Sequence, residues 1–238
     1  MNARERMLGR LRAAAPAQVS GDELKHLDEQ IDLHYDSRRV ALPTQALVES
    51  MHAALAASHA EVFRATEHTW PALIAQRLLA TNVKRLLLDT SCAEGAALAE
   101  VLPSSVATRN YDQPIENWKA ELFDTIDAGF TVARSGIAST GTLIVAPDAS
   151  SPRTMSLVPP LHIALVYAHS LHADLHAAMR AEHWQAGMPT NLVMISGPSK
   201  TSDIQQTLAY GAHGPRELWV VIVEPQTDAA AATEGDAA

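Results

Sequence analysis

The stretch Ile-Ser-Gly-Pro-Ser-Lys-Thr-Ser-Asp-Ile-Gln at 195–205 gathers the residue types that bind small anions. It follows the apolar run Leu192–Ile195, and its Gly-Pro pair predicts a tight turn after a strand. Ser202 and Gln205 match the S-x-x-Q capping box, which predicts a helix over Ser202–Ala209. Because a helix N-terminus presents free N–H groups, this order of elements favours a phosphate or carboxylate site.

The predicted anion site consists of the turn and the residues that follow it. In open α/β sheets such ligands bind beyond the carboxyl ends of the strands, where we expect this loop to lie. The alternative is a capped turn in which Ser199 and Asp203 bond only the backbone. The candidate ligand-binding residues are Gly197, Ser199, Lys200, Thr201, Ser202 and Asp203.

A second glycine-rich break, Gly-Ala-His-Gly-Pro at 211–215, follows shortly after the first. Its histidine, His213, is the candidate catalytic residue, since it would polarise a substrate oxygen or transfer a proton near neutral pH. Gly214 is a candidate ligand contact beside it. Alternatively, the two glycines only end the preceding helix, and His213 bonds the free carbonyls of that helix.

Two further loops carry weaker candidates. Thr140, Gly141 and Thr142 place a glycine between two hydroxyls, which allows close backbone approach to a ligand and equally suits a hairpin turn. Arg153 would clamp a carboxylate, although most arginines near loops are simply solvated.

The two main motifs resemble the end of the lactate utilization protein C family, the LUD-domain proteins. Ser-Gly-Pro-Ser-x-Thr-x-Asp-Ile is followed by Gly-x-His-Gly-Pro, and two earlier stretches, 136–143 and 153–159, agree with the same family. The resemblance covers roughly residues 105–224. Two positions depart from it, because family members often carry an acidic residue in place of Ser139 and a Glu in place of Gln205.

The resemblance implies a fold, partners and a reaction. LUD-domain proteins have a three-layer α/β/α fold with a mostly parallel sheet, similar to the sugar-phosphate isomerase and CoA-transferase group. In that family's setting the protein acts with two iron–sulfur subunits in oxidising L-lactate to pyruvate. With the two family acids missing, any proton transfer would fall to His213, Asp112 or Glu116.

Composition bounds the class of protein. The 238 residues, 47% of them hydrophobic, suit an α/β domain with a sizeable core. A net charge of −9 argues against binding to nucleic acid or anionic membranes. We find no apolar run long enough to span a bilayer and no signal-peptide pattern in residues 1–12, so we expect a cytoplasmic protein. The single cysteine, Cys92, excludes a cysteine-ligated iron–sulfur cluster built by this chain alone, and we expect no cofactor here.

Histidines form a further group. His169, His172, His176 and His183 fall on one face of a helix predicted over Leu171–Gln185. The spacing of His172 and His176 can bind zinc, but without a nearby cysteine a polar helix face is the better interpretation, and no metal is predicted. Asp89 ends a predicted strand and is expected to cap the helix that follows.

The remaining pattern predicts three regions. Residues 1–43 are expected to form a helix (3–15) and a loose arm, residues 44–225 the LUD-type α/β domain, and residues 226–238 a disordered tail. Strands alternating with helices indicate a mostly parallel sheet covered on both sides. Strands are expected at 61–66, 84–88, 106–111, 130–133, 142–146, 161–168, 192–196 and 218–224, and helices at 44–59, 70–80, 95–102 and 117–126.

Three functions remain open at this point. The first is an accessory subunit that binds a small anionic metabolite and acts with iron–sulfur partners. The second is a stand-alone enzyme on a small phosphorylated or carboxylated metabolite. The third is a ligand-sensing or assembly module without chemistry.

Overall fold

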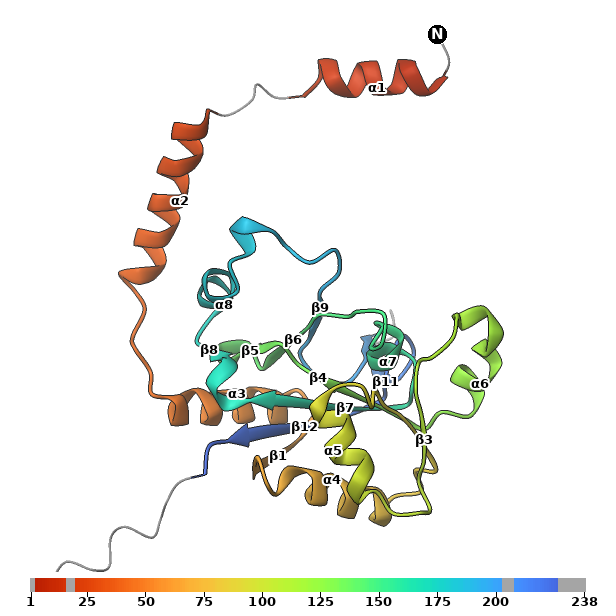
Figure 1. Cartoon of the computed structure of the whole chain (residues 1–238). Helices are drawn as coiled ribbons and strands as arrows, with labels where there is room; N and C mark the ends of the chain where they lie inside the picture. The colour runs from red at the N-terminus through yellow and green to blue at the C-terminus, as the bar shows by residue number, and fades with distance from the viewer. Residues whose placement is uncertain (1–2, 16–19, 203–207, 227–238) are drawn as a thin grey trace, which may run out of the picture. The chain divides into compact units, whose positions relative to one another are not determined.

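The computed structural model describes residues 3–15, 20–202 and 208–226. It divides into two units, Met1–Ala41 and Leu42–Ala238 (Figure 1). The first unit holds helices α1 (Ala3–Ala13) and α2 (Gly21–Asp36). The expectation of a loose arm over 16–43 is therefore wrong, because Ser20 and Glu23 form a capping box that starts α2. The predicted tail lies, from residue 227 onward, outside the described residues.

The second unit is built on a six-stranded sheet with the order β1-β12-β7-β4-β2-β3 among the described residues. All neighbouring strands in it run parallel, which confirms the predicted α/β class. The strands are β1 (Glu61–Thr66), β12 (Glu217–Glu224), β7 (Leu161–Tyr167), β4 (Ala128–Val132), β2 (Arg85–Leu87) and β3 (Ala107–Arg109).

Helices and a second, smaller sheet cover the two faces of the main sheet (Figure 1). On one face α4 (Trp70–Ala80) and α5 (Ala93–Val101) pack against it, with the rings of Trp70 and Phe130 stacked at 5.9 Å. On the other face lie α3 (Thr44–Ala57) and the small sheet. The result is a three-layer α/β arrangement. None of the described helices combines the length and apolar character that a membrane crossing requires.

The small sheet has the order β8-β5-β6-β9, and β10 and β11 form a separate two-stranded sheet. These elements are β8 (Leu171–His172), β5 (Ser135–Ile137), β6 (Thr142–Val145), β9 (Val193–Ile195), β10 (Lys200–Ser202) and β11 (Leu208–Tyr210). The remaining short elements are α6 (Lys119–Asp124), α7 (Thr154–Leu157), α8 (Leu175–Ala181), η1 (Ile115–Asn117), η2 (Ala138–Thr140), η3 (Ala168–Ser170) and η4 (Trp184–Ala186).

Central strands are apolar on both sides. Residues 218–223 of β12 are all buried, as expected for a strand without polar alternation. Two polar side chains break this rule in the neighbouring strands: Thr131 of β4 is 3% exposed and His162 of β7 is 1% exposed. Both lie on the face that α3 and the small sheet cover, since their strand partners Ala164 and Leu218 belong to that core cluster.

Two predicted helices differ from the structure in part. Of the helix expected over Ser202–Ala209, residues 203–207 lie outside the described residues, and at its ends Lys200–Ser202 and Leu208–Tyr210 pair as antiparallel strands. Where a helix was expected over Leu171–Gln185, the chain first forms strand β8, which pairs with β5, and α8 begins only after the Asp174 cap.

Candidate functional site

The two glycine-containing motifs meet at Ser199. Its backbone N–H donates to the carbonyl of Pro215 at 2.8 Å, and its own carbonyl accepts from the N–H of Gly211 at 2.9 Å. A Cβ on Gly214 would lie 3.2 Å from the Ser199 Cβ, so only glycine fits this approach comfortably. The motifs thus form one structural unit, in which the segments 196–199 and 211–215 lie side by side.

A cavity of about 220 Å³ opens beside this junction. Roughly 300–1,000 Å³ is usual for pockets that hold drug-sized ligands, so this cavity suits a metabolite of a few heavy atoms. Its lining combines apolar side chains, among them Val193, Ile195 and Leu218, with a small set of polar groups. The polar lining residues are Ser156, His162, Ser196, Ser199 and His213.

His162 is the buried polar group of this cavity. Its Nε2 atom is hydrogen-bonded to the Thr131 hydroxyl at 2.8 Å. Its Nδ1 atom is buried and finds no hydrogen-bond partner among the described residues. A buried polar atom without a partner costs free energy, and such atoms in native proteins call for an explanation. The His162 side chain also lines the cavity.

The cavity has little fixed charge. Burial lowers the pKa of His162 to about 4, so its imidazole is neutral at physiological pH. No Lys, Arg, Asp or Glu is found among the described lining residues. The other lining imidazole, that of His213, is exposed. The arrangement fits a small, partly apolar ligand held by hydroxyl and imidazole groups.

Four of the sequence-predicted residues line this cavity: Gly197, Ser199, His213 and Gly214. Lys200 and Thr201 do not line it; they lie on β10, where Lys200 is exposed. Ser202 ends the same strand, and Asp203 lies outside the described residues. Ser202, where the predicted helix would begin, is the last residue of a strand, so no helix begins at that residue.

The position of the cavity in the sheet also differs from the expectation. His162 and Leu218 lie near the starts of β7 and β12, so the cavity is at the amino ends of the parallel strands. The loop follows β9, which belongs to the small mixed sheet and not to the main sheet. Placement of the loop beyond the carboxyl ends of the main strands was therefore wrong.

The remaining predicted ligand residues have other surroundings. The Thr142 hydroxyl shares hydrogen bonds of 2.7 Å with Thr140 and with Ser196, and so joins β6 to the cavity wall. Gly141 approaches α3 and not a ligand, because a Cβ there would lie 2.7 Å from the Leu55 backbone nitrogen. Arg153 is exposed, precedes α7 and does not line the cavity.

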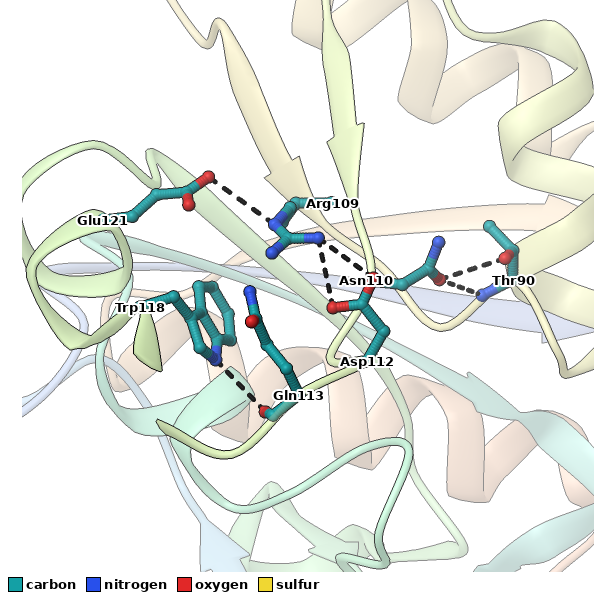
Figure 2. Close-up of polar contacts among 7 residues, drawn as sticks. All are labelled: Thr90, Arg109, Asn110, Asp112, Gln113, Trp118 and Glu121. Carbon is teal, nitrogen blue, oxygen red and sulfur yellow. Dashed lines mark hydrogen bonds and ion pairs between the residues drawn. The ribbon is translucent and has the colours of Figure 1, made fainter. Parts of the chain in front are cut away.

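The two acids considered for proton transfer lie after β3. Figure 2 shows Arg109 between Asp112 and Glu121, at 3.1 Å and 3.5 Å. The Trp118 indole donates to the Gln113 carbonyl at 3.3 Å. Asp112 is thus ion-paired, and neither it nor Glu116 lines the cavity that contains His213.

A second, smaller hollow of about 130 Å³ lies at the carboxyl ends of β2 and β4, where the strand order reverses. Asp89, Cys92 and Glu94 line it together with Thr131. Asp89 accepts hydrogen bonds from Ser91 and does not cap α5, which begins after the Cys92 cap. Burial raises the pKa of the Cys92 thiol, and the neighbouring carboxylates raise it further, so the reactive thiolate is disfavoured.

The histidines predicted on one helix face are dispersed. His169 lies in η3, His172 on β8, His176 on α8, and His183 beyond it with φ 56°. In the part of the chain that the structure describes, no three or more His, Cys, Asp or Glu side chains gather as a metal-binding group.

His162 was not among the site residues predicted from the sequence. The available signal was a single polar residue inside the apolar strand Leu161–Tyr167. His162 is distant in sequence from both motifs. It comes close to them only because β7 and β12 pair in the main sheet.

The fold is an α/β arrangement with a cavity between segments 196–199 and 211–215, and comparison with known proteins gives its family. The LUD domain family model matches residues 48–223. The chain therefore belongs to the LUD-domain family.

Named relatives and a solved structure agree with this assignment. An uncharacterized protein of Neisseria meningitidis serogroup B, NMB1437, is 36% identical over 228 residues, 94% of this chain and 95% of the relative. Lactate utilization protein C of Deinococcus radiodurans is 35% identical over 105 residues, 44% of this chain and 49% of the relative. The counterpart in Halalkalibacterium halodurans is 31% identical over 44% of this chain and 47% of its own length. The matches to these two proteins therefore span about half of their length.

The crystal structure of a DUF162 family protein from Deinococcus radiodurans has the same fold. It aligns with a TM-score of 0.56 and 23% identity, over 77% of this chain and 99% of that chain. At this identity the likeness concerns the fold alone.

Proposed function

We propose that this chain is a lactate-utilization protein that binds a small monocarboxylate in the cavity between segments 196–199 and 211–215. In this proposal it acts with iron–sulfur partner subunits in the oxidation of L-lactate to pyruvate and carries no electrons itself. The observation that carries the proposal is the convergence of the two family motifs, through Ser199, on one small cavity. The names of the Deinococcus and Halalkalibacterium relatives supply lactate as the metabolite.

The chemistry of the cavity supports a short carboxylic acid. Hydroxyls of Ser196 and Ser199 and the exposed imidazole of His213 are available at its polar side, and a carboxylate accepts hydrogen bonds from such donors. The apolar side chains of Val193, Ile195 and Leu218 suit a methyl group. Since the lining has no lysine or arginine, affinity would depend on hydrogen bonds from the serine hydroxyls and the His213 imidazole.

Calorimetry on the full chain tests the binding step. Titration with L-lactate and with pyruvate is expected to show saturable binding, and His213→Asn is expected to weaken it about tenfold through loss of a charge-assisted hydrogen bond. His68→Asn serves as the matched control, because His68 is exposed and does not line the cavity. Absence of binding by both acids would remove the proposed site.

Growth tests the biological step. A strain without this gene is expected to grow on pyruvate and to fail on L-lactate, and a copy that encodes the His213→Asn variant is expected to restore growth only in part. Equal growth of the deletion strain on both carbon sources, in a background without a second copy, would refute the role in lactate use.

A further inference from the structure

The buried side of the cavity carries a group that the family motifs do not contain. His162 lies on β7, is 1% exposed and lines the cavity, and its Nδ1 atom has no partner among the described residues. Its ring is held from the other side by Thr131, whose hydroxyl contacts Nε2 at 2.8 Å. One nitrogen is thus hydrogen-bonded to the protein, and the other is an unpartnered atom of a side chain that lines the cavity.

We propose that Nδ1 of His162 hydrogen-bonds the 2-hydroxyl group of the ligand, so that this site selects short 2-hydroxy acids over acids that lack an oxygen at that carbon. This inference rests on the proposed carboxylate site and adds the ligand's second polar contact. The carboxylate would lie toward Ser199 and His213, and the 2-hydroxyl toward the buried imidazole.

The protonation state of the imidazole explains why a hydroxyl is the matching group. Burial holds the pKa of His162 near 4, so the ring is neutral and one nitrogen donates while the other accepts. The Thr131 hydroxyl can donate or accept, so it permits either tautomer. A ligand hydroxyl also does both, and it therefore satisfies Nδ1 in either tautomer. A carboxylate oxygen only accepts and would meet a donor in one tautomer alone.

The buried location makes the contact selective. A ligand without the hydroxyl would displace water and leave the buried Nδ1 atom unpaired. An unpaired buried polar atom costs free energy, so such a ligand would bind more weakly than one that carries the hydroxyl. The apolar neighbours Leu218 and Val193 offer no replacement partner. Selectivity therefore depends on one atom of one side chain, and this makes the inference testable by a single substitution.

Calorimetry on the full chain, with L-lactate and propionate as probes, tests this directly, because propionate keeps the carboxylate and the methyl end but lacks the hydroxyl. The wild-type protein is expected to bind L-lactate at least about tenfold more tightly than propionate. His162→Phe, which keeps a ring but removes both nitrogens, is expected to reduce this preference to about twofold or less. His172→Phe is the control, since His172 is half-buried and does not line the cavity; it should keep the wild-type preference.

A second measurement, on the wild-type protein, tests the proposal even if His162→Phe does not fold. The ¹⁵N signal of His162 Nδ1 in the wild-type protein is expected to shift when L-lactate is added and to stay in place with propionate. Equal affinity for both acids in the wild type, or an unmoved Nδ1 signal at saturating L-lactate, would overturn the role of His162 and leave the carboxylate site standing. Lack of binding by either acid would overturn both proposals.

Discussion

Gly197 lies directly against Ser58 at the end of α3. A Cβ on Gly197 would be 2.9 Å from the Ser58 carbonyl oxygen and 3.0 Å from its Cβ, and the Gly197 backbone has φ 136°. This contact places the start of segment 196–199 against the C-terminal end of α3. Because Gly197 has no side chain, this wall of the candidate site can pack closely against the end of α3.

Substitution of Gly197 is expected to damage both the fold and the site. Gly197→Val adds a β-branched side chain where backbone conformation and space both forbid it, and we expect a loss of about 2–4 kcal/mol in the free energy of unfolding. Chemical denaturation measures the loss. Gly187→Ala is the control, because Gly187 also has a positive φ of 154° but has no atom within 4 Å of the added carbon. If both variants lose equal stability, the contact with Ser58 is not important.

Gly141 gives a related prediction with a different outcome for ligand binding. Its φ is 61°, and a Cβ there would lie 2.7 Å from the Leu55 nitrogen and 2.9 Å from the Ala54 carbonyl carbon. Gly141→Ala is expected to destabilise the protein by about 1–3 kcal/mol, because α3 must move away from η2. Below the melting temperature the variant should still bind L-lactate. A specific loss of binding in a fully folded Gly141→Ala protein would restore the ligand role first considered for this loop.

Much of the main sheet was predictable because its signals are local. The boundaries of β1 and α4 follow directly from apolar spacing, and Pro71 marks the first turn of α4. The helix predicted over 202–209 disagrees with the structure at its two ends, because Ser202 and Leu208 pair as strand residues, while residues 203–207 lie outside the described part of the chain. The two residues of β8 are too few to show any period, so only their pairing with β5 reveals them.

The candidate site was predictable in part for the same reason. Segments 196–199 and 211–215 are close in sequence, and their glycines and histidine mark them as unusual. His162 enters the site through parallel pairing of β7 with β12, a long-range relation that no local pattern encodes. The placement of the cavity at the amino ends of these strands likewise depends on the order of the sheet.

The iron content of the purified chain tests the proposal that the partner subunits, and not this chain, carry the electrons. With Cys92 as the one cysteine in the sequence, thiolate ligands for a cluster cannot come from a single chain. We expect the isolated protein to be colourless, with far less than one iron atom per chain by elemental analysis. Visible absorbance with stoichiometric iron and sulfide would contradict the proposal that electrons travel through partner subunits.

Glu182 fixes the end of α8 to the small sheet. Its carboxylate accepts a short hydrogen bond from the Ser135 hydroxyl and one of 2.8 Å from the Trp184 indole, and lies 3.2 Å from Arg134. The Glu182 side chain is 7% exposed. Glu182→Ala would leave buried donors unpaired, with an expected loss of about 1–3 kcal/mol in unfolding free energy. Glu182→Gln, which keeps an acceptor, should lose less.

Exposed acids offer the comparison for Glu182. Glu217 pairs with Arg216 at 3.3 Å, but their side chains are 52% and 65% exposed. Glu217→Ala is therefore expected to change the unfolding free energy by less than about 1 kcal/mol. Trp184 fluorescence should report the disturbance at Glu182 and remain unchanged in Glu217→Ala. Equal stability of Glu182→Ala and the wild type would show that the buried carboxylate is not needed.

His162 is expected to make stability depend on pH in one window. Burial lowers its pKa from the ordinary 6.5 to about 4 in the folded protein. Between these pH values His162 is protonated in the unfolded chain but remains neutral in the folded protein. Stability therefore falls as the pH drops from 6.5 to 4. Above pH 6.5 the imidazole is neutral in both states and contributes no slope.

The size of this effect follows from the pKa difference. At 1.36 kcal/mol per pKa unit, the wild-type protein should lose on the order of 3 kcal/mol through this group between neutral pH and pH about 4. His162→Gln keeps a polar group that can bond Thr131 but does not titrate, so its unfolding free energy should decline less steeply over the same range. Urea denaturation of both proteins across this range measures the difference, which cancels the carboxylates they share. Parallel curves would mean that His162 is accessible to protons in the folded state, and hence that the buried imidazole is not held neutral for a ligand.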